Sequence, residues 1–451
     1  MLPRRALLLS AALATACWLQ ASPAGAMNLL QAYQIALQQD ATTRAARAAA
    51  QAGNERVDQA QAQFYPQLSL SASYQRNDLS LSQETAQGRT TGASDRYPSH
   101  NSTLSLRQPL YRKALAVGLE QARSQRDQVD AALERETQNL SARVAEAYMQ
   151  ILLARDQLAL IQAQKLATTT QLDAARKSLA AGSGTRTDID EAQARLDMAL
   201  AQELEAQQQQ GYTQRRLEVL VNTPVDIAAL WPVDAGRLST WEPEARSLPD
   251  WLARAEDRSP ELRQLKARIE TARLEVDKAR SGHLPTLDAV AQWSRSASES
   301  VTTPSSRYTN RTIGLQLNVP LYAGGYVSAT VRQALAEQEQ AQEQLEAGRR
   351  DLALRIHTEF RNVSEGLLRI RALEQATRSA AQVAMSSRKS FLGGARTLVD
   401  VLNADQQEAQ AQRDLARARY AYLISCIRLQ ALAGEEREAG IAAVNTVLAS
   451  P

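Results

Sequence analysis

Large aromatic side chains and cysteine are both scarce in this chain. Of its 451 residues, Phe, Trp and Tyr together make up 4%, and cysteine occurs only twice. The length would allow several domains, but so few large rings do not predict several independent hydrophobic cores. Ala, Gln, Leu, Arg and Glu recur instead, which is typical of long helices packed closely on small side chains.

The chain also lacks a marked net charge and a cluster of catalytic residues. It carries 52 basic and 49 acidic residues, a formal net charge of +3, which argues against bulk electrostatic binding of nucleic acid. The three histidines, His100, His283 and His357, are scattered over a predicted loop, a helix end and a long helix. They do not predict a metal or acid–base site, and we expect neither an enzyme nor a cofactor.

The N-terminal segment has the three regions of a secretory signal peptide. Arg4 and Arg5 precede an apolar run from Ala6 to Leu19, and Ala24-Gly25-Ala26 follows before Met27. We therefore predict cleavage after residue 26, which would lower the net charge to +1 because the removed segment carries two arginines and no acid. A retained buried helix is one alternative.

Cys17 allows a second alternative for the same segment, lipoprotein processing. That cleavage usually requires an apolar Leu or Val three residues before the cysteine, and Ala14 stands there. If residues 1–26 are removed, only Cys426 remains, so no disulfide can form within the chain.

Short motifs of the first half recur in the same order in the second half. The recurring pairs are Val57–Ala60 with Val276–Ala279, Pro66–Leu68 with Pro285–Leu287, Pro109–Tyr111 with Pro320–Tyr322, and Gly184–Thr187 with Gly394–Thr397. Such order indicates an internal duplication. The predicted organisation is a signal peptide (1–26), a first repeat (27–221), a connecting segment (222–249), a second repeat (250–434) and a C-terminal tail (435–451).

Each predicted repeat begins with a helix, at about residues 28–63 and 250–281, and then changes its period. In Leu68–Tyr74, for example, apolar residues alternate with Ser, which is typical of a strand with one apolar face. Similar alternation predicts four strands, at about residues 66–76, 102–111, 285–295 and 310–320. The polar stretches 77–100 and 297–310 are expected to form exposed loops. Tyr65, Tyr111 and Tyr322 flank the strands and fit either an interfacial aromatic girdle or ordinary packing.

An unusually long helical segment follows each strand pair. Residues 119–181 contain neither Gly nor Pro, and as one helix they would extend about 95 Å. Apolar residues seven apart, such as Leu133, Leu140 and Ala147, indicate a coiled-coil seam. Gly182–Gly184 and Gly393–Gly394 should break the two long helices, so that each turns back as a hairpin.

Four strands of about ten residues have the length of tilted transmembrane β-strands. They are too few to close a barrel, and lipid has no water to satisfy an open sheet edge. If the strands cross a membrane, the chain must therefore oligomerise. A soluble α+β protein whose strands cover a helical core is the alternative, but it leaves the long hairpins and the export signal unexplained.

Five motifs, in order and within the duplicated frame, resemble one known family. They are Asn28–Tyr33 (NLLQAY), Gly282–Leu287 (GHLPTL), Val319–Gly325 (VPLYAGG), Gly394–Leu402 (GARTLVDVL) and Ala418–Ile424 (ARYAYLI). With them the chain resembles the TolC family of outer-membrane efflux and secretion proteins over nearly all of its mature length.

The resemblance implies a mixed α/β membrane protein of the Gram-negative outer membrane that extends into the periplasm. Three chains with four strands each would form a 12-stranded β-barrel, continued by a long α-helical coiled-coil barrel. The implied partners are a periplasmic adaptor (membrane fusion protein) and an inner-membrane ABC or proton-driven transporter. The channel would be a passive conduit, opened at its periplasmic helix tips by these partners.

The resemblance also implies a gate at the helix tips. Asp400 matches an acidic ring residue, Arg396 matches a gate-locking arginine, and Asp173 matches its acceptor on the neighbouring hairpin. Asn403 departs from the family pattern because a second ring aspartate is expected there, and Phe391 replaces a gate tyrosine. Three-fold symmetry would place three carboxylates around the axis, as in cation-selective pores. Without the resemblance, all of these would be ordinary solvated helix-end residues.

The hairpin turns are the expected points of contact with partner proteins. The residues concerned are Gly184, Thr185, Arg186, Gly394 and Thr397. A periplasmic coiled-coil adaptor or scaffold is the competing functional interpretation, but it would not need strands with lipid-facing rows. The cargo is not encoded in a recognisable motif, and the lack of a convincing lipidation site favours protein secretion over drug efflux.

Overall fold

The computed structural model describes residues 27–84, 88, 90–241, 246–300 and 303–449. The predicted signal peptide and Cys17 lie outside the described residues. The chain divides into two compact units. One unit holds the described residues within Met1–Ala46, Leu133–Pro260 and Arg349–Pro451, and the other holds those within Arg47–Ala132 and Glu261–Gly348. We call the first the helical unit and the second the sheet unit.

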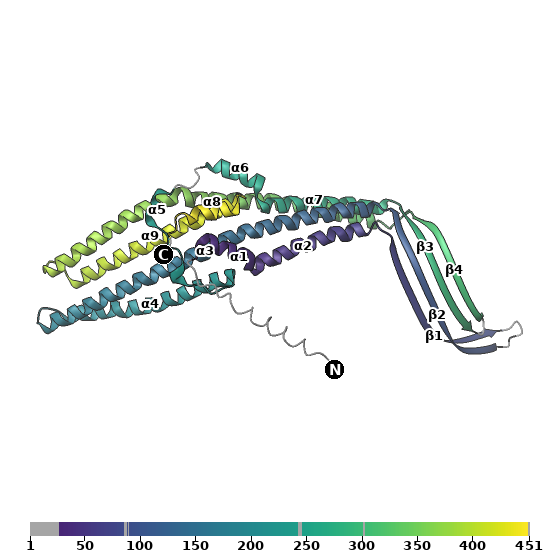
Figure 1. Cartoon of the computed structure of the whole chain (residues 1–451), viewed down its shortest axis with the longest axis horizontal. Coiled ribbons are helices and arrows are strands. Elements are labelled where there is room, and N and C mark those ends of the chain that lie inside the picture. Colours follow the sequence, from purple (N-terminus) through teal and green to yellow (C-terminus); the bar gives the residue numbers. More distant parts are fainter. Residues whose placement is uncertain (1–26, 85–87, 89, 242–245, 301–302, 450–451) are drawn as a thin grey trace, which may run out of the picture. The chain divides into compact units, whose positions relative to one another are not determined.

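Two long helical hairpins run through the helical unit (Figure 1). They are formed by α3 (Lys113–Ala180) with α4 (Arg186–Val221) and by α8 (Tyr326–Leu392) with α9 (Leu398–Leu432). Interhelical ion pairs hold each hairpin together, for example Lys165 Nζ with Glu203 Oε2 at 2.6 Å and Arg419 Nη2 with Glu374 Oε1 at 2.8 Å. The predicted long helices are confirmed: α3 has 68 residues and α8 has 67.

The predicted breaks in the long helices are also confirmed. Gly182 and Gly394 lie in the turns with φ values of 77° and 76°, a left-handed conformation that glycine adopts without a steric penalty. The next helix then begins with a capping box in both hairpins, Thr185 with Asp188 and Thr397 with Asp400.

Short elements complete the helical unit. They are α1 (Leu29–Gln39), the 3-10 helix η1 (Ile227–Ala229), α5 (Ala235–Thr240), α6 (Leu248–Arg258) and α10 (Arg437–Asn445). The C-terminal segment holds the first helix, because Asn445 Oδ1 accepts hydrogen bonds from the amides of Leu29 (3.1 Å) and Leu30 (3.4 Å). It also pairs with the connecting segment, since the amide of Asp234 donates to the carbonyl of Val447 at 3.0 Å.

The predicted single helices at residues 28–63 and 250–281 are each broken in two. The first is divided at Asp40 into α1 and α2 (Ala41–Ala62), and the second at Ser259 into α6 and α7 (Pro260–Arg280). Both dividing residues have an extended backbone conformation, which interrupts the helix. At Ser259 the cause is the following proline, whose ring disfavours helical geometry in the preceding residue. A second 3-10 helix, η2 (Ser281–His283), ends α7.

The sheet unit contains one antiparallel sheet in which the strands follow chain order (Figure 1). The strands are β1 (Gln67–Glu84), β2 (Thr90–Tyr111), β3 (Thr286–Ser300) and β4 (Thr303–Asn318). The prediction of four strands is confirmed, but the loops predicted at 77–100 and 297–310 were wrong. The β1–β2 ladder continues to the pair Glu84 and Thr90, so the strands extend through most of these polar residues. Polar composition indicated loops, but a paired partner strand satisfies the backbone equally well.

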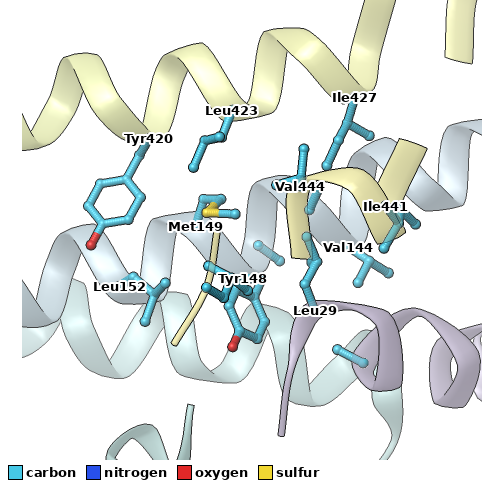
Figure 2. Close-up of a cluster of buried hydrophobic side chains, with 14 of the residues drawn as sticks. Leu29, Val144, Tyr148, Met149, Leu152, Tyr420, Leu423, Ile427, Ile441 and Val444 are labelled. Carbon is cyan, nitrogen blue, oxygen red and sulfur yellow. The ribbon is translucent and has the colours of Figure 1, made fainter. Parts of the chain in front are cut away.

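A large apolar cluster fills the middle of the helical unit (Figure 2). Leu29 of α1, Tyr148 and Met149 of α3, and Leu423 of α9 are all fully buried there. The Tyr148 hydroxyl lies within donating distance of the carbonyls of Met27 (2.9 Å) and Trp231 (3.1 Å) and accepts a hydrogen bond from the amide of Trp231 (2.8 Å). A buried polar atom is thus satisfied, and both segments are fixed. Within the described part of the chain, no helix is both long and apolar enough to cross a lipid bilayer.

Candidate gate at the helix tips

The turn ends of the two hairpins share a small apolar cluster. Leu172 and Ala175 of α3, Ala192 of α4, and Leu398 and Leu402 of α9 are buried there. Phe391, expected at the gate in place of a tyrosine, packs against this cluster from the end of α8. It therefore has an apolar packing role and, having no hydroxyl, makes no hydrogen bond through its side chain.

Asp400 lies in the first turn of α9 and is fully exposed. Its Oδ2 accepts hydrogen bonds from the amide (2.9 Å) and the hydroxyl (2.7 Å) of Thr397. These bonds, first the one from the backbone amide, lower the pKa of Asp400 below its ordinary value, and Arg396 adds a smaller contribution. Asp400 is therefore ionised at neutral pH.

The structure does not bring Arg396 and Asp173 together within one chain. Arg396 Nη1 donates to Ser387 Oγ at 2.6 Å, on the same hairpin. Asp173 Oδ1 instead faces Arg176 Nη1 of its own helix at 3.7 Å. The expected link between these two residues therefore stays a prediction about hairpins of neighbouring chains.

A different polar link joins the two hairpins inside the chain. Arg195 Nη2 of α4 donates to Asn403 Oδ1 of α9 at 2.8 Å, and its Nη1 bonds to Gln406 of the same helix. Asn403, the residue that departs from the family pattern, is thus the acceptor for a guanidinium on the other hairpin. Arg195 lies outside the motifs from which the gate residues were predicted.

A second link lies beside the first. Gln171 Nε2 of α3 donates to Asp405 Oδ2 of α9 at 2.6 Å. Arg388 Nη2 of α8 lies 2.8 Å from Asp405 Oδ1. The Asp405 side chain is only 13% exposed, so this carboxylate is shared between three helices. Arg195 and Asn403 are 208 residues apart in sequence, and Gln171 and Asp405 are 234 apart, so no local spacing could have indicated these two hydrogen bonds.

An open, mostly apolar groove of about 520 Å³ runs along the same region. Leu166 of α3 and Leu392 of α8 contribute to its wall and are 68% and 85% exposed. Phe391 and Val401 line it as well. Large apolar side chains therefore lie exposed on the wall of this groove.

The expected partner-contact residues surround the two turns. Thr185 and Thr397 cap the return helices, and Arg186 pairs with Asp190 of its own helix at 3.3 Å. Gly184 is sterically required, since a Cβ there would lie 2.9 Å from the amide nitrogen of Leu179. The described residues contain no group of three His, Cys, Asp or Glu side chains placed to hold a metal ion.

The helix tips thus combine an apolar cluster, an exposed carboxylate and polar links between the hairpins. Comparison with known proteins gives the family. The family described as "Outer membrane efflux protein" matches residues 32–223 and 251–435. The proteases secretion protein PrtF of Dickeya chrysanthemi is 35% identical over 437 residues, covering 96% of this chain and 93% of that protein. The outer membrane protein TolC of Escherichia coli is 30% identical, covering 94% of this chain and 86% of TolC.

Solved structures agree on the fold. The outer membrane protein VceC of Vibrio cholerae superposes with a TM-score of 0.72 at 20% identity, covering 91% of this chain and 96% of that one. CusC superposes with a TM-score of 0.74 at 18% identity, covering 90% and 92%. The chain belongs to the outer membrane efflux protein family. It is an outer-membrane channel protein of a Gram-negative bacterium that serves secretion or efflux.

Proposed function

We propose that three copies of this chain form one continuous conduit for type I protein secretion. The observation that carries this proposal is a sheet with two unpaired edges, β1 and β4, and a largely exposed apolar row on one face. Exposed members of that row include Leu70 (71%), Ile313 (89%) and Leu315 (69%). Apolar residues in such a row suit lipid, and unpaired edges in lipid must be closed by further strands.

Three sheets of four strands would make a 12-stranded barrel, within the range of outer-membrane barrels. The helical hairpins would continue it as a coiled-coil tunnel of twelve helices across the periplasm. The element order supports the duplication, because each half contains two short helices, two strands, one long helix and one return helix. In this arrangement residues 1–26 are a signal peptide, 27–221 and 250–434 are the repeats, 222–249 connect them, and 435–451 form a tail.

Protein cargo is favoured by the nature of the relatives. PrtF is a proteases secretion protein, and AprF of Pseudomonas aeruginosa, 35% identical over 435 residues, is an alkaline protease secretion protein. The proposed assembly includes a periplasmic adaptor and an inner-membrane ABC transporter, which would supply the energy. The turns carrying Gly184 and Gly394 would meet the adaptor, and the conduit itself would be passive, without catalysis or cofactor.

The assembly is tested by fractionation of the mature protein. We expect it in the outer-membrane fraction, extracted only by detergent, and migrating as a trimer before heating and as a monomer after heating. A water-soluble monomer without a detergent requirement would refute the proposal.

The gate is tested by planar-bilayer recording. Asp400→Ala should reduce the preference for cations and the block by divalent cations, because it removes three carboxylates from the proposed ring. Arg396→Ser should raise conductance if Arg396 locks neighbouring hairpins through Asp173. Unchanged currents in both variants would remove the gate assignment while leaving the conduit intact.

A further inference from the structure

The strands carry an uneven distribution of arginine that the conduit alone does not require. Strands β1 to β4 contain six arginines and no lysine. Side chains alternate between the two faces of a sheet, so each position can be assigned to a face by its register with the apolar residues. Five arginines share the face of the apolar row: Arg76, Arg96, Arg295, Arg307 and Arg311. Only Arg107 lies on the other face.

These arginines follow the apolar row at the same end of the sheet. In β1, the row from Leu68 to Tyr74 is followed by Arg76, and in β3, Trp293 is followed on the same face by Arg295. Strand β4 runs the opposite way, and its Arg311 is paired with Trp293. This end is the one at which the strands turn, away from the chain connections to α2, α3, α7 and α8.

Four of the five guanidinium groups differ from the fifth in their contacts. Arg96 forms an ion pair with Asp78 at 2.9 Å, but Arg76, Arg295, Arg307 and Arg311 have no hydrogen-bond or ionic partner among the described residues. All four are exposed. Arg107, by contrast, is bound on the opposite face to Asp288, with Nη2 at 2.5 Å from Oδ2.

A row of about 20 Å of apolar residues followed by free arginines has the profile of a surface that crosses hydrocarbon and then meets charged headgroups. Guanidinium is planar, always charged, and matches phosphate oxygens through two parallel hydrogen bonds. If the helices lie in the periplasm, as in the proposed conduit on which this inference rests, the arginine end lies in the outer leaflet. That leaflet consists of an anionic glycolipid with phosphate groups on its sugar backbone.

We infer that Arg76, Arg295, Arg307 and Arg311 form a binding band for the phosphates of the outer-leaflet glycolipid. In a trimer the band would repeat three times around the barrel. It would anchor the channel vertically in an asymmetric membrane and select phosphorylated glycolipid over neutral lipid. Tyr74 and Trp293 lie on the same face and would place their polar groups at the boundary between hydrocarbon and headgroups.

The inference is tested by titrating the detergent-solubilised full channel with lipid A and counting bound molecules by native mass spectrometry. The variant Arg295→Gln/Arg307→Gln/Arg311→Gln should lose affinity about a hundredfold, since each arginine near an anionic lipid surface contributes about fivefold. Wild-type protein should bind lipid A from which the phosphates have been removed as weakly as the variant binds intact lipid A.

A matched control removes the same charge elsewhere. Arg44 and Arg56 of α2 and Arg332 of α8 are exposed and likewise without a side-chain partner among the described residues. Their triple Gln variant should bind lipid A as wild type does. Equal lipid A affinity in the strand variant and wild type, with both channels still heat-dissociable oligomers, would overturn the inference alone. Failure of wild type and both variants to form a detergent-dependent oligomer would instead overturn the conduit.

Discussion

At the residue scale, Asp40 shows how one side chain can end one helix and begin the next. Its carboxylate is buried and accepts hydrogen bonds from the amide (2.8 Å) and hydroxyl (2.9 Å) of Thr43, at the start of α2. Arg143 of α3 lies 3.2 Å away. Burial raises the pKa of Asp40, but the hydrogen bonds from Thr42 and Thr43 outweigh it, and the pKa lies below its ordinary value.

We expect Asp40→Ala to lower the free energy of unfolding by about 2 kcal/mol, because an N-cap is lost and Arg143 loses a partner. Asp40→Asn should cost less, since Asn also caps. The pKa of Asp40 is lower in the folded protein than in the unfolded chain. The charged carboxylate therefore stabilises the fold at pH values above the unfolded pKa, and this stabilisation is lost as the pH falls through the folded pKa. Thermal unfolding followed by circular dichroism from pH 7 to 3 should therefore show wild type converging on Asp40→Asn below pH 4. A constant difference between them over that range would contradict the assignment.

If the helix tips form a gate, the link made by Arg195 should affect how often the channel opens. Its bonds to Asn403 and Gln406 join the hairpins within one chain, and such a link is worth about 1 kcal/mol or about fivefold in an equilibrium. Arg195→Ala should raise the opening frequency in planar bilayers about fivefold without changing ion selectivity. The matched control is Arg186→Ala, because among the described residues the Arg186 side chain pairs with Asp190 of its own helix and with no residue of the other hairpin. Equal opening in the two variants would assign Arg195 to the solvated surface.

At the element scale, the hairpin turn at Gly182 requires glycine because of its backbone conformation and not because of side-chain contacts. A Cβ at Gly182 would meet no atom within 4 Å, and the same is true of Gly118 inside α3, but only Gly182 has a positive φ, 77°. Gly182→Ala should therefore destabilise the protein by about 1–2 kcal/mol, and Gly118→Ala should stabilise it by about 0.5–1 kcal/mol. Opposite shifts of the thermal midpoint would confirm the explanation. Shifts of the same sign would point to contacts across the turn instead.

Much of this element pattern could be predicted from the sequence, because it rests on local signals. The absence of Gly and Pro over 119–181 predicted α3, and alternation in Leu68–Tyr74 predicted β1. The outer parts of the strands could not be predicted in this way, since their residues are polar on both faces and only pairing with a partner strand fixes them. The division at Asp40 was missed because the surrounding sequence has strong helix propensity, and a single carboxylate provides the alternative partner for the next helix.

At the scale of the whole molecule, the sequence located the candidate site but not its internal bonds. Asp400 and Phe391 were predicted at the helix tips from the family resemblance, and they lie there in the structure. The partners of Asn403 and Asp405 lie on other helices, far away in sequence, and depend on how the hairpins pack. A link between Arg396 and Asp173 depends on a neighbouring chain and is therefore beyond what one sequence can fix.

The proposed closure of the sheet by neighbouring chains can be tested at edge strand β4, by comparing the amides that face β3 with the amides that point away from it. In an antiparallel ladder, successive amides point to opposite sides, so of Gly314 and Leu315 one bonds to β3 and the other points away from it. Proline removes the amide at its position and is tolerated only where that amide has no partner. If β4 were a free edge, only one of the variants Gly314→Pro and Leu315→Pro would be damaging.

In a closed trimeric wall, the outward amide of β4 bonds to β1 of the next chain, and both proline variants should abolish the heat-dissociable trimer. The measurement is the oligomer fraction on gels before and after heating, with Gly314→Ala and Leu315→Ala as controls that keep both amides. Survival of the trimer in one of the two proline variants would show that β4 remains an open edge. An unpaired backbone edge is not stable in hydrocarbon. The apolar row on β4 would then have to be covered by protein and not by lipid.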